Sequence, residues 1–186
     1  CIGSIVIRSK PMDNPLEEEV IHAICEVIKK EGENLLDFNP EVEQWQNRIL
    51  SLGQWRPSEE WPDVSTPALL KTCDQWLSPY LNGVTKNEDL KKIDLLNALH
   101  YHLDPDKQQQ LEKLAPQKIK VPSGSAIRLK YASDGSPPVL PVRLQEMFGQ
   151  ADTPRVNNGE TPVLLHLLSP GYKPVQVTSD LQNFWN

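Results

Sequence analysis

The sequence predicts an α+β fold, with a helical first half followed by a small antiparallel sheet of two hairpins and packed short helices. Two observations support this class. Apolar residues recur at the helical spacing i, i+3, i+4 through most of residues 15–115. At Pro116 the period becomes two, and apolar and cationic residues alternate as far as Tyr131. The same change of period predicts two regions, 1–115 and 116–186, which can still pack as one unit.

The first half is expected to hold an opening strand and five helices. Residues 2–9 are the predicted strand. The first helix begins at Asn14-Pro15, an N-cap and N1 pair followed by glutamates, and is expected to close at Gly32. Apolar stripes and the caps Ser65-Thr66-Pro67 and Asp104-Pro105 indicate the others. Their expected ranges are 40–52, 66–77, 87–103 and 105–114.

The second half is expected to contain two hairpins and two short helices. The first hairpin runs through 118–121 and 127–131. A helix over 140–148 should end at Gly149. The turn Asn157-Asn158-Gly159 should lead into strand 163–168, whose apolar residues on both sides predict a central strand covered on both faces. A strand at 174–178 and a last helix capped by Thr178 or Ser179 complete the expected order.

Composition favours a globular chain in a reducing compartment. Of its 186 residues 38% are hydrophobic, yet no apolar run approaches the roughly 20 residues that cross a bilayer. The first residues lack the basic flank of a signal peptide, so they are expected to be a strand cut from a longer protein. Three cysteines give no disulfide framework, and Cys25 and Cys73 are expected to be buried free thiols. We therefore expect a cytoplasmic protein.

Charge divides the chain unevenly. Residues 1–115 carry 12 Lys and Arg against 20 Asp and Glu, whereas residues 116–186 carry 7 against 5. An acidic first half repels polyanions. Any contact with nucleic acid is therefore expected in the second half.

No motif predicts catalysis by this chain. It has no phosphate loop, and neither a Gly-x-Ser-x-Gly elbow nor a recognisable Cys/His pair is present. His100 and His102 lie about 200° apart on a helix and cannot chelate one metal together. Asp104 is better explained as a helix cap, and His166 as a core or half-buried residue. We predict no catalytic and no metal-binding residue.

Four cations in the first hairpin are the candidate nucleic-acid contacts: Lys118, Lys120, Arg128 and Lys130. Alternation should project them from one side of the sheet, where they could neutralise phosphates while Tyr131 and Tyr172 stack on bases. The alternative is a solvated outer face, or lysines that protect an edge strand, and four cations beside an acidic half fit it well. The tryptophans are assigned to packing, and Arg48 and Arg56 to pairing with nearby carboxylates.

Several ordered motifs resemble the C-terminal region of bacterial HrpB-type ATP-dependent helicases, DEAH/RHA-like members of superfamily 2. They cover most of residues 50–186. The motifs are Trp-Pro-Asp (61–63), Leu-Ala-Pro (114–116), Val-Pro-Ser-Gly-Ser (121–125), Pro-Pro-Val-Leu-Pro-Val-Arg-Leu-Gln-Glu-Met-Phe-Gly (137–149), Leu-Leu-Ser-Pro (167–170), Lys-Pro-Val-Gln-Val-Thr-Ser-Asp-Leu (173–181) and Phe-Trp (184–185).

The resemblance implies a non-catalytic accessory module of a helicase that acts on RNA or another nucleic acid. Its partners would be the helicase core domains of the same polypeptide, which would hold ATP and Mg²⁺, and a basic tail would follow Asn186. The main alternative is a protein-interaction module that uses the acidic helical half and the tryptophan-bearing loop 54–63. An independent hydrolase is a third interpretation.

Overall fold

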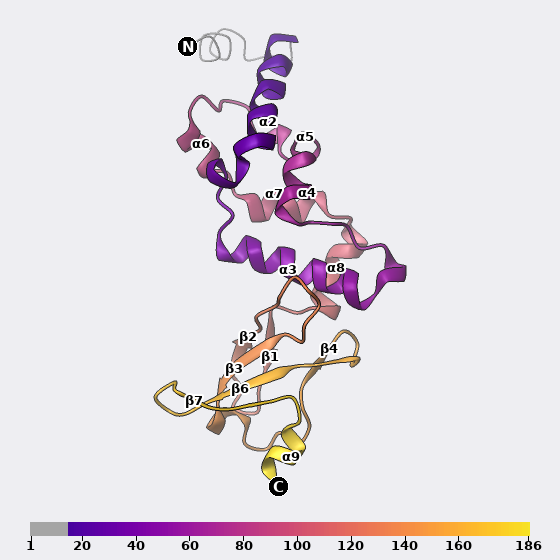
Figure 1. Ribbon diagram of the computed structural model, residues 1–186, viewed down its shortest axis with the longest axis vertical. Coiled ribbons are helices and arrows are strands. Elements are labelled where there is room, and N and C mark those ends of the chain that lie inside the picture. Colours follow the sequence, from indigo (N-terminus) through magenta and orange to yellow (C-terminus); the bar gives the residue numbers. More distant parts are fainter. Residues whose placement is uncertain (1–14) are drawn as a thin grey trace. The chain divides into compact units, whose positions relative to one another are not determined.

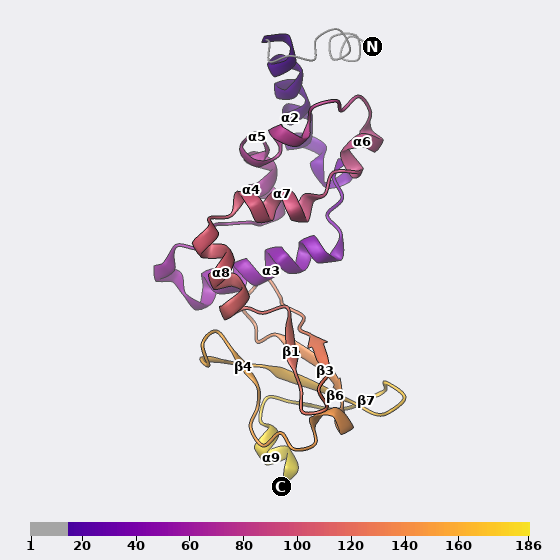
Figure 2. The ribbon, with the colours of Figure 1, turned by 180° about the vertical axis from the view of Figure 1, so that it is seen from behind.

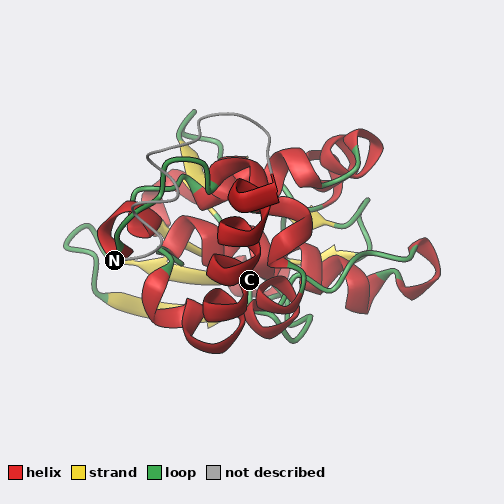
Figure 3. Cartoon of the chain, turned by 90° about the horizontal axis from the view of Figure 1, so that it is seen from above, coloured by secondary structure: helices red, strands yellow, loops and turns green. Residues whose placement is uncertain are grey.

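The computed structural model describes residues 15–186 as helices followed by short strands (Figure 1). This order confirms the α+β class, and the two kinds of element are distinguished by colour in Figure 3. The strand predicted at 2–9 lies outside the described residues. No helix within residues 15–186 is long and apolar enough to cross a membrane.

The chain forms two compact units, and each is made of two separate segments. Unit 1 comprises residues up to Glu43 together with Asp63–Asp104, and unit 2 comprises Gln44–Pro62 together with Pro105–Asn186. The expected boundary cuts the chain once, at residue 116. The observed units interleave instead, because most of one early helix and one later helix belong with the strands.

Unit 1 is helical. Its elements are α2 (Pro15–Leu35), α4 (Thr66–Lys71), α5 (Cys73–Trp76), the 3-10 turn η2 (Ser78–Tyr80), α6 (Asn87–Lys91) and α7 (Leu95–His102). Helix α2 packs against α4, α5 and α6. Cys25 and Cys73 are buried free thiols in this core, as predicted.

Three helix predictions in unit 1 were wrong in their ends. Helix α2 runs through Gly32 because that residue is a point of close packing, where a Cβ atom would lie 2.3 Å from Leu70 Cδ2. The third predicted helix breaks at Thr72, whose hydroxyl donates to the Ala68 carbonyl oxygen. The fourth breaks before Asp94, which caps α7 by accepting from the Asn97 amide.

Two helices that precede the strands in the sequence belong to unit 2. They are α3 (Pro40–Trp55), which enters this unit from Gln44, and α8 (Pro105–Leu114); the 3-10 turn η1 (Pro57–Glu59) follows α3. One polar face of α3 donates hydrogen bonds to the loop segment 131–135. Asn47 donates to the Tyr131 carbonyl oxygen at 3.0 Å, Ser51 to that of Ala132 at 2.6 Å and Trp55 to that of Gly135 at 2.7 Å.

The strands form three small sheets. The elements are β1 (Lys118–Lys120), β2 (Ala126–Arg128), β3 (Val139–Arg143), η3 (Leu144–Met147), β4 (Arg155–Val156), β5 (Thr161–Pro162), β6 (Leu164–Leu168), β7 (Pro174–Thr178) and α9 (Leu181–Trp185). Strands β1 and β2 form an antiparallel hairpin, as do β4 and β5. The third sheet has the order β3-β6-β7, and its strands lie side by side in both views (Figures 1 and 2).

The third sheet corrects two predictions. Residues 139–143 are a strand and not the start of a helix, because they pair with β6 and only 144–147 coil, as a 3-10 turn. That pairing is parallel, so the sheet is mixed and not wholly antiparallel. Gly149 still ends the turn, with a φ of 95°.

Strand β6 is central, as predicted, but only one of its faces is fully covered. Leu165 and Leu167 are buried, whereas Leu164, His166 and Leu168 are half-buried. The turn at Asn157-Asn158-Gly159 is confirmed by three successive positive φ angles. The cap of α9 is Asp180 and not Thr178 or Ser179, since the Asp180 carboxylate accepts from the Asn183 amide at 3.1 Å.

Candidate functional site

The predicted cationic hairpin is formed as expected. Lys118 lies directly opposite Arg128 in the β1–β2 register, and Lys120 lies opposite Ala126. Residues that face each other across an antiparallel pair project from the same side of the sheet. Ile119 and Ile127, one residue away in the alternation, turn to the other side and are half-buried.

The fourth cation joins the same face through β3. Beyond β2, Lys130 pairs with Val139 through two backbone hydrogen bonds of 2.9 Å. Leu129 and Tyr131 on either side of it are buried, so Lys130 projects outward with Arg128. The four predicted side chains therefore share one face of the strands.

These cations are available to a ligand. All four are exposed, and within residues 15–186 none has a carboxylate partner. Ion pairs on a surface compete with a ligand for the same cation. The hairpin thus presents four exposed positive charges to solvent.

The two tyrosines proposed as stacking partners differ. Tyr131 is 3% exposed, and its hydroxyl donates to the Pro116 carbonyl oxygen at 2.8 Å, so it cannot stack on a base. Burial raises the pKa of this hydroxyl. Tyr172 is 66% exposed at the β6–β7 turn, and the Arg143 guanidinium lies 5.4 Å from its ring centroid. Of the two tyrosines, only Tyr172 has an exposed ring, and Arg143 already lies against that ring.

The arginines and tryptophans of the first half stabilise the fold, as predicted. Arg48 pairs with Glu112 at 2.8 Å, and Arg56 pairs with Glu59 at 2.7 Å. Trp45, Trp61 and Trp76 are buried. With Trp61 buried and the Trp55 indole bonded to Gly135, loop 54–63 offers little aromatic surface to a protein partner.

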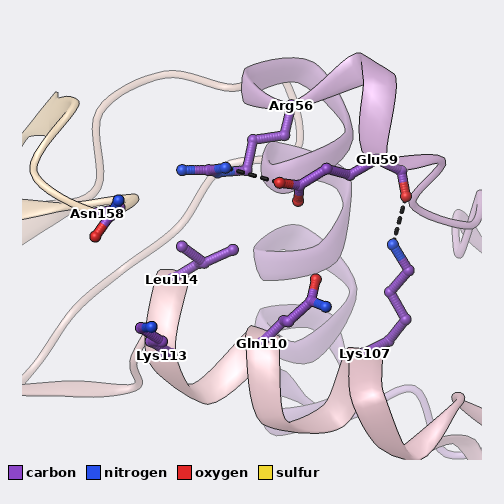
Figure 4. Close-up of a pocket in the computed structure, with 7 residues that line it drawn as sticks. All are labelled: Arg56, Glu59, Lys107, Gln110, Lys113, Leu114 and Asn158. Carbon is purple, nitrogen blue, oxygen red and sulfur yellow. Dashed lines mark hydrogen bonds and ion pairs between the residues drawn. The ribbon is translucent and has the colours of Figure 1, made fainter.

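The structure also contains a polar pocket of about 420 Å³ in unit 2, which the sequence did not predict. Its lining residues come from three places: Arg56 and Glu59 after α3, Lys107, Gln110, Lys113 and Leu114 on α8, and Asn158 in the β4–β5 turn (Figure 4). Gln110 points from α8 toward the wall formed by Arg56 and Glu59. Leu114 is the one apolar residue of this lining.

Glu59 organises one wall of the pocket. Its two carboxylate oxygens accept from Arg56 Nη1 at 2.7 Å and from Trp61 Nε1 at 3.2 Å. Its carbonyl oxygen accepts from the Lys107 ammonium, which also lies 4.4 Å from the centroid of the Trp61 ring. The hydrogen bond from Arg56 is the main reason that the pKa of Glu59 is lowered. Glu59 therefore stays ionised and holds Arg56 in place.

No metal site emerges from the described residues. Among residues 15–186, no three His, Cys, Asp or Glu side chains gather closely enough to hold a metal ion. His166 lies in β6 between Pro141 and Val177 of the neighbouring strands, and its half-buried position matches the prediction.

Comparison with known proteins gives a consistent match. Residues 76–186 match the family described as ATP-dependent helicase C-terminal, of the HrpB type. The chain is 39% identical over 184 residues to the ATP-dependent RNA helicase HrpB of Escherichia coli strain K12, and that alignment covers 99% of the chain but 23% of the relative. This chain thus spans about a quarter of the length of that relative.

Two solved structures are similar to this fold. The crystal structure of the E. coli DExH-box NTPase HrpB matches with a TM-score of 0.86 and 39% identity, covering 94% of this chain and 21% of that one. The crystal structure of the E. coli DEAH/RHA helicase HrpB matches with a TM-score of 0.81 and 38% identity, over 95% and 22%. The resemblance seen in the motifs is confirmed, and this chain belongs to the HrpB-type family of ATP-dependent helicase C-terminal domains.

Proposed function

We propose that this chain is the non-catalytic accessory module of an ATP-dependent RNA helicase, and that it contacts nucleic acid through the β1–β2 hairpin. ATP and Mg²⁺ would bind to the helicase core of the same polypeptide, in the cytoplasm. The observation that carries the nucleic-acid contact is the set of four exposed cations on one face: Lys118, Lys120, Arg128 and Lys130. Family membership and the name of the E. coli relative support RNA as the ligand.

The proposed contact is mainly with phosphates. Each phosphate contact to a single strand contributes about 0.7 to the slope of log affinity against log salt. Four contacts therefore predict a slope of about −3 from the hairpin alone. Tyr172, exposed at the β6–β7 turn beside Arg143 of β3, adds a sequence-tolerant stacking partner.

The test is a titration of the 186-residue chain with single-stranded RNA at low and at physiological salt. Replacing all four hairpin cations with alanine should abolish most of the affinity and flatten the salt slope by about 3. A control variant removes four exposed lysines of unit 1 instead: Lys30, Lys71, Lys91 and Lys92. An equal loss of RNA affinity in both variants, or no loss in the hairpin variant, would contradict the assignment.

The module is also proposed to brace the helicase core, and the exposed edge of β7 supports this role. Val175 and Val177 are 53% and 52% exposed on a strand that pairs on one side only among the described strands. An uncovered edge strand with exposed valines tends to be covered in a stable assembly. Hydrogen exchange of residues 174–178 should be slower in the full-length helicase than in this chain. Equal exchange rates would remove β7 from the bracing surface.

A further inference from the structure

We propose that the pocket between α8, η1 and the β4–β5 turn is a binding site for a phosphate group, separate from the hairpin. Among residues 15–186, four donor groups of the lining make no hydrogen bond within the protein. They are Arg56 Nη2, the Gln110 amide, the Lys113 ammonium and the Asn158 amide. The inference does not depend on the hairpin contact, since the two sites share no residue.

In the described part of the chain, Arg56 Nη2 makes no hydrogen bond because the protein binds the other donor groups of this guanidinium. Arg56 donates its Nε to Asn157 Oδ1 at 2.5 Å and its Nη1 to Glu59. The Glu160 carboxylate forms an ion pair with Nη2 at 4.0 Å, which is too far for a hydrogen bond. Within residues 15–186, the side chains of Gln110, Lys113 and Asn158 have no hydrogen-bond or ion-pair partner.

The charge of the lining favours an anion. Arg56, Lys107 and Lys113 carry three positive charges against two carboxylates. Both oxygens of Glu59 already accept hydrogen bonds from the protein, and the Glu160 carboxylate lies 4.0 Å from Arg56 Nη2. A ligand therefore meets net positive charge and unpaired donors. Only Leu114 in the lining is apolar, whereas pockets for apolar ligands are lined mostly by hydrophobic side chains.

The chemistry that fits this donor set is a phosphate. Its oxygens are acceptors only, and a planar guanidinium with an ammonium group binds them by charge-assisted hydrogen bonds. A volume of about 420 Å³ also leaves room for more than the phosphate itself. The group could belong to a nucleic-acid strand or to a free mononucleotide, since both present the same oxygens.

The backbone supports this arrangement at two points. Lys107, Gln110 and Leu114 are spaced i, i+3, i+7 on α8, so that one face of the helix lines the pocket. Asn158 stands in a turn with φ near 56°, between two other residues of positive φ, and this fixes its position at the pocket. Both walls are thus set by secondary structure.

The experiment is a two-dimensional NMR titration of the whole 186-residue chain with inorganic phosphate, following the side-chain amides of Gln110 and Asn158. Both should shift in a saturable manner. Lys113→Ala should weaken binding about three- to tenfold. Glu160→Gln should strengthen it about two- to fivefold, because a competing carboxylate is removed beside Arg56. Lys173→Ala, which removes an exposed cation elsewhere in unit 2, is the matched control and should leave binding unchanged.

Further arms identify the source of the phosphate and separate this site from the hairpin. The chain is titrated in turn with adenosine monophosphate, a 5′-phosphorylated RNA and the same RNA with a 5′-hydroxyl end. Tighter binding of one of these ligands identifies the source of the phosphate and supports the site. The hairpin variant should keep its phosphate response even if it binds no RNA. Unmoved Gln110 and Asn158 amides at tens of millimolar phosphate would overturn the inference, as would equal affinity in Lys113→Ala.

Discussion

Arg48 offers a sharp test of what holds unit 2 together. It is 2% exposed in α3, its Nε donates to the Ala115 carbonyl oxygen at 2.7 Å, and its Nη2 lies 2.8 Å from a Glu112 oxygen. Ala115 is fully buried, whereas the Glu112 side chain is 54% exposed. If the arginine is removed, water can therefore reach the Glu112 carboxylate easily but cannot reach the Ala115 carbonyl.

The expected losses follow from that difference. Arg48→Ala leaves the Ala115 carbonyl without a partner, which costs about 1–3 kcal/mol. It also removes two buried stem methylenes, worth about 0.8 kcal/mol each. We expect the free energy of unfolding to fall by about 3–4 kcal/mol. Glu112→Ala should lower it by no more than about 1 kcal/mol, because water solvates the exposed end of the ion pair.

Urea unfolding followed by tryptophan fluorescence measures both changes. Four of the five tryptophans lie in unit 2, so the signal reports mainly on that unit. With a slope of about 1.5–2 kcal/mol per molar urea, Arg48→Ala should lower the midpoint by about 2 M. Arg48→Lys, which can still donate to the Ala115 carbonyl, should have a urea midpoint between those of the unmodified chain and Arg48→Ala. A Glu112→Ala variant as unstable as Arg48→Ala would refute the reasoning, because the ion pair would then be the main contribution.

Three further predictions test local packing. Gly32→Ala should destabilise unit 1 by about 1–2 kcal/mol in thermal unfolding, because its Cβ would lie 2.3 Å from Leu70. Gly53→Ala is the control within a helix. A Cβ added there would lie 3.8 Å from its nearest neighbour, Trp61 Cβ, so this substitution should be neutral or stabilising. Burial, with nearby Cys25, raises the pKa of the Cys73 thiol to about 12, so the native state keeps the thiol protonated. Stability should therefore fall as pH rises above about 9, where the unfolded thiol ionises, and less so in Cys73→Ala. Gly135→Ala should destabilise unit 2, since φ is +79° there and a Cβ would lie 2.8 Å from Gln54 Cβ; normal stability would mean that the loop can shift.

The first hairpin could be predicted from sequence because its information is local. Alternating residues 118–121 and 127–131 specify both strands and the side on which the cations project. The helix expected at 140–148 failed for the opposite reason. Residues 139–143 become a strand through pairing with 164–168, and that partner is distant in sequence. Helical preference of Leu-Gln-Glu-Met survives only as one 3-10 turn.

The polar pocket of unit 2 could not be predicted for a related reason. It gathers ordinary residues from segments near 56, 107–114 and 158, and none of these segments carries a recognisable motif. The one local signal was the i, i+3, i+7 spacing on α8, which also fits a solvated helix face. In contrast, the ion pairs of Arg48 and Arg56 could be predicted, because many carboxylates surround both arginines in the sequence.

The bonds from α3 to segment 131–135 have a consequence for sequence variation. Every acceptor on that segment is a backbone carbonyl, which all residue types share. The side chains of Ala132 and Ser133 are exposed, whereas the Asp134 carboxylate accepts hydrogen bonds from Ser136. The identities of Ala132 and Ser133 should therefore vary freely during evolution while the segment keeps its path. Selection should act instead on Asn47, Ser51 and Trp55. These side chains of α3 fix the path of a loop about 80 residues away in the sequence.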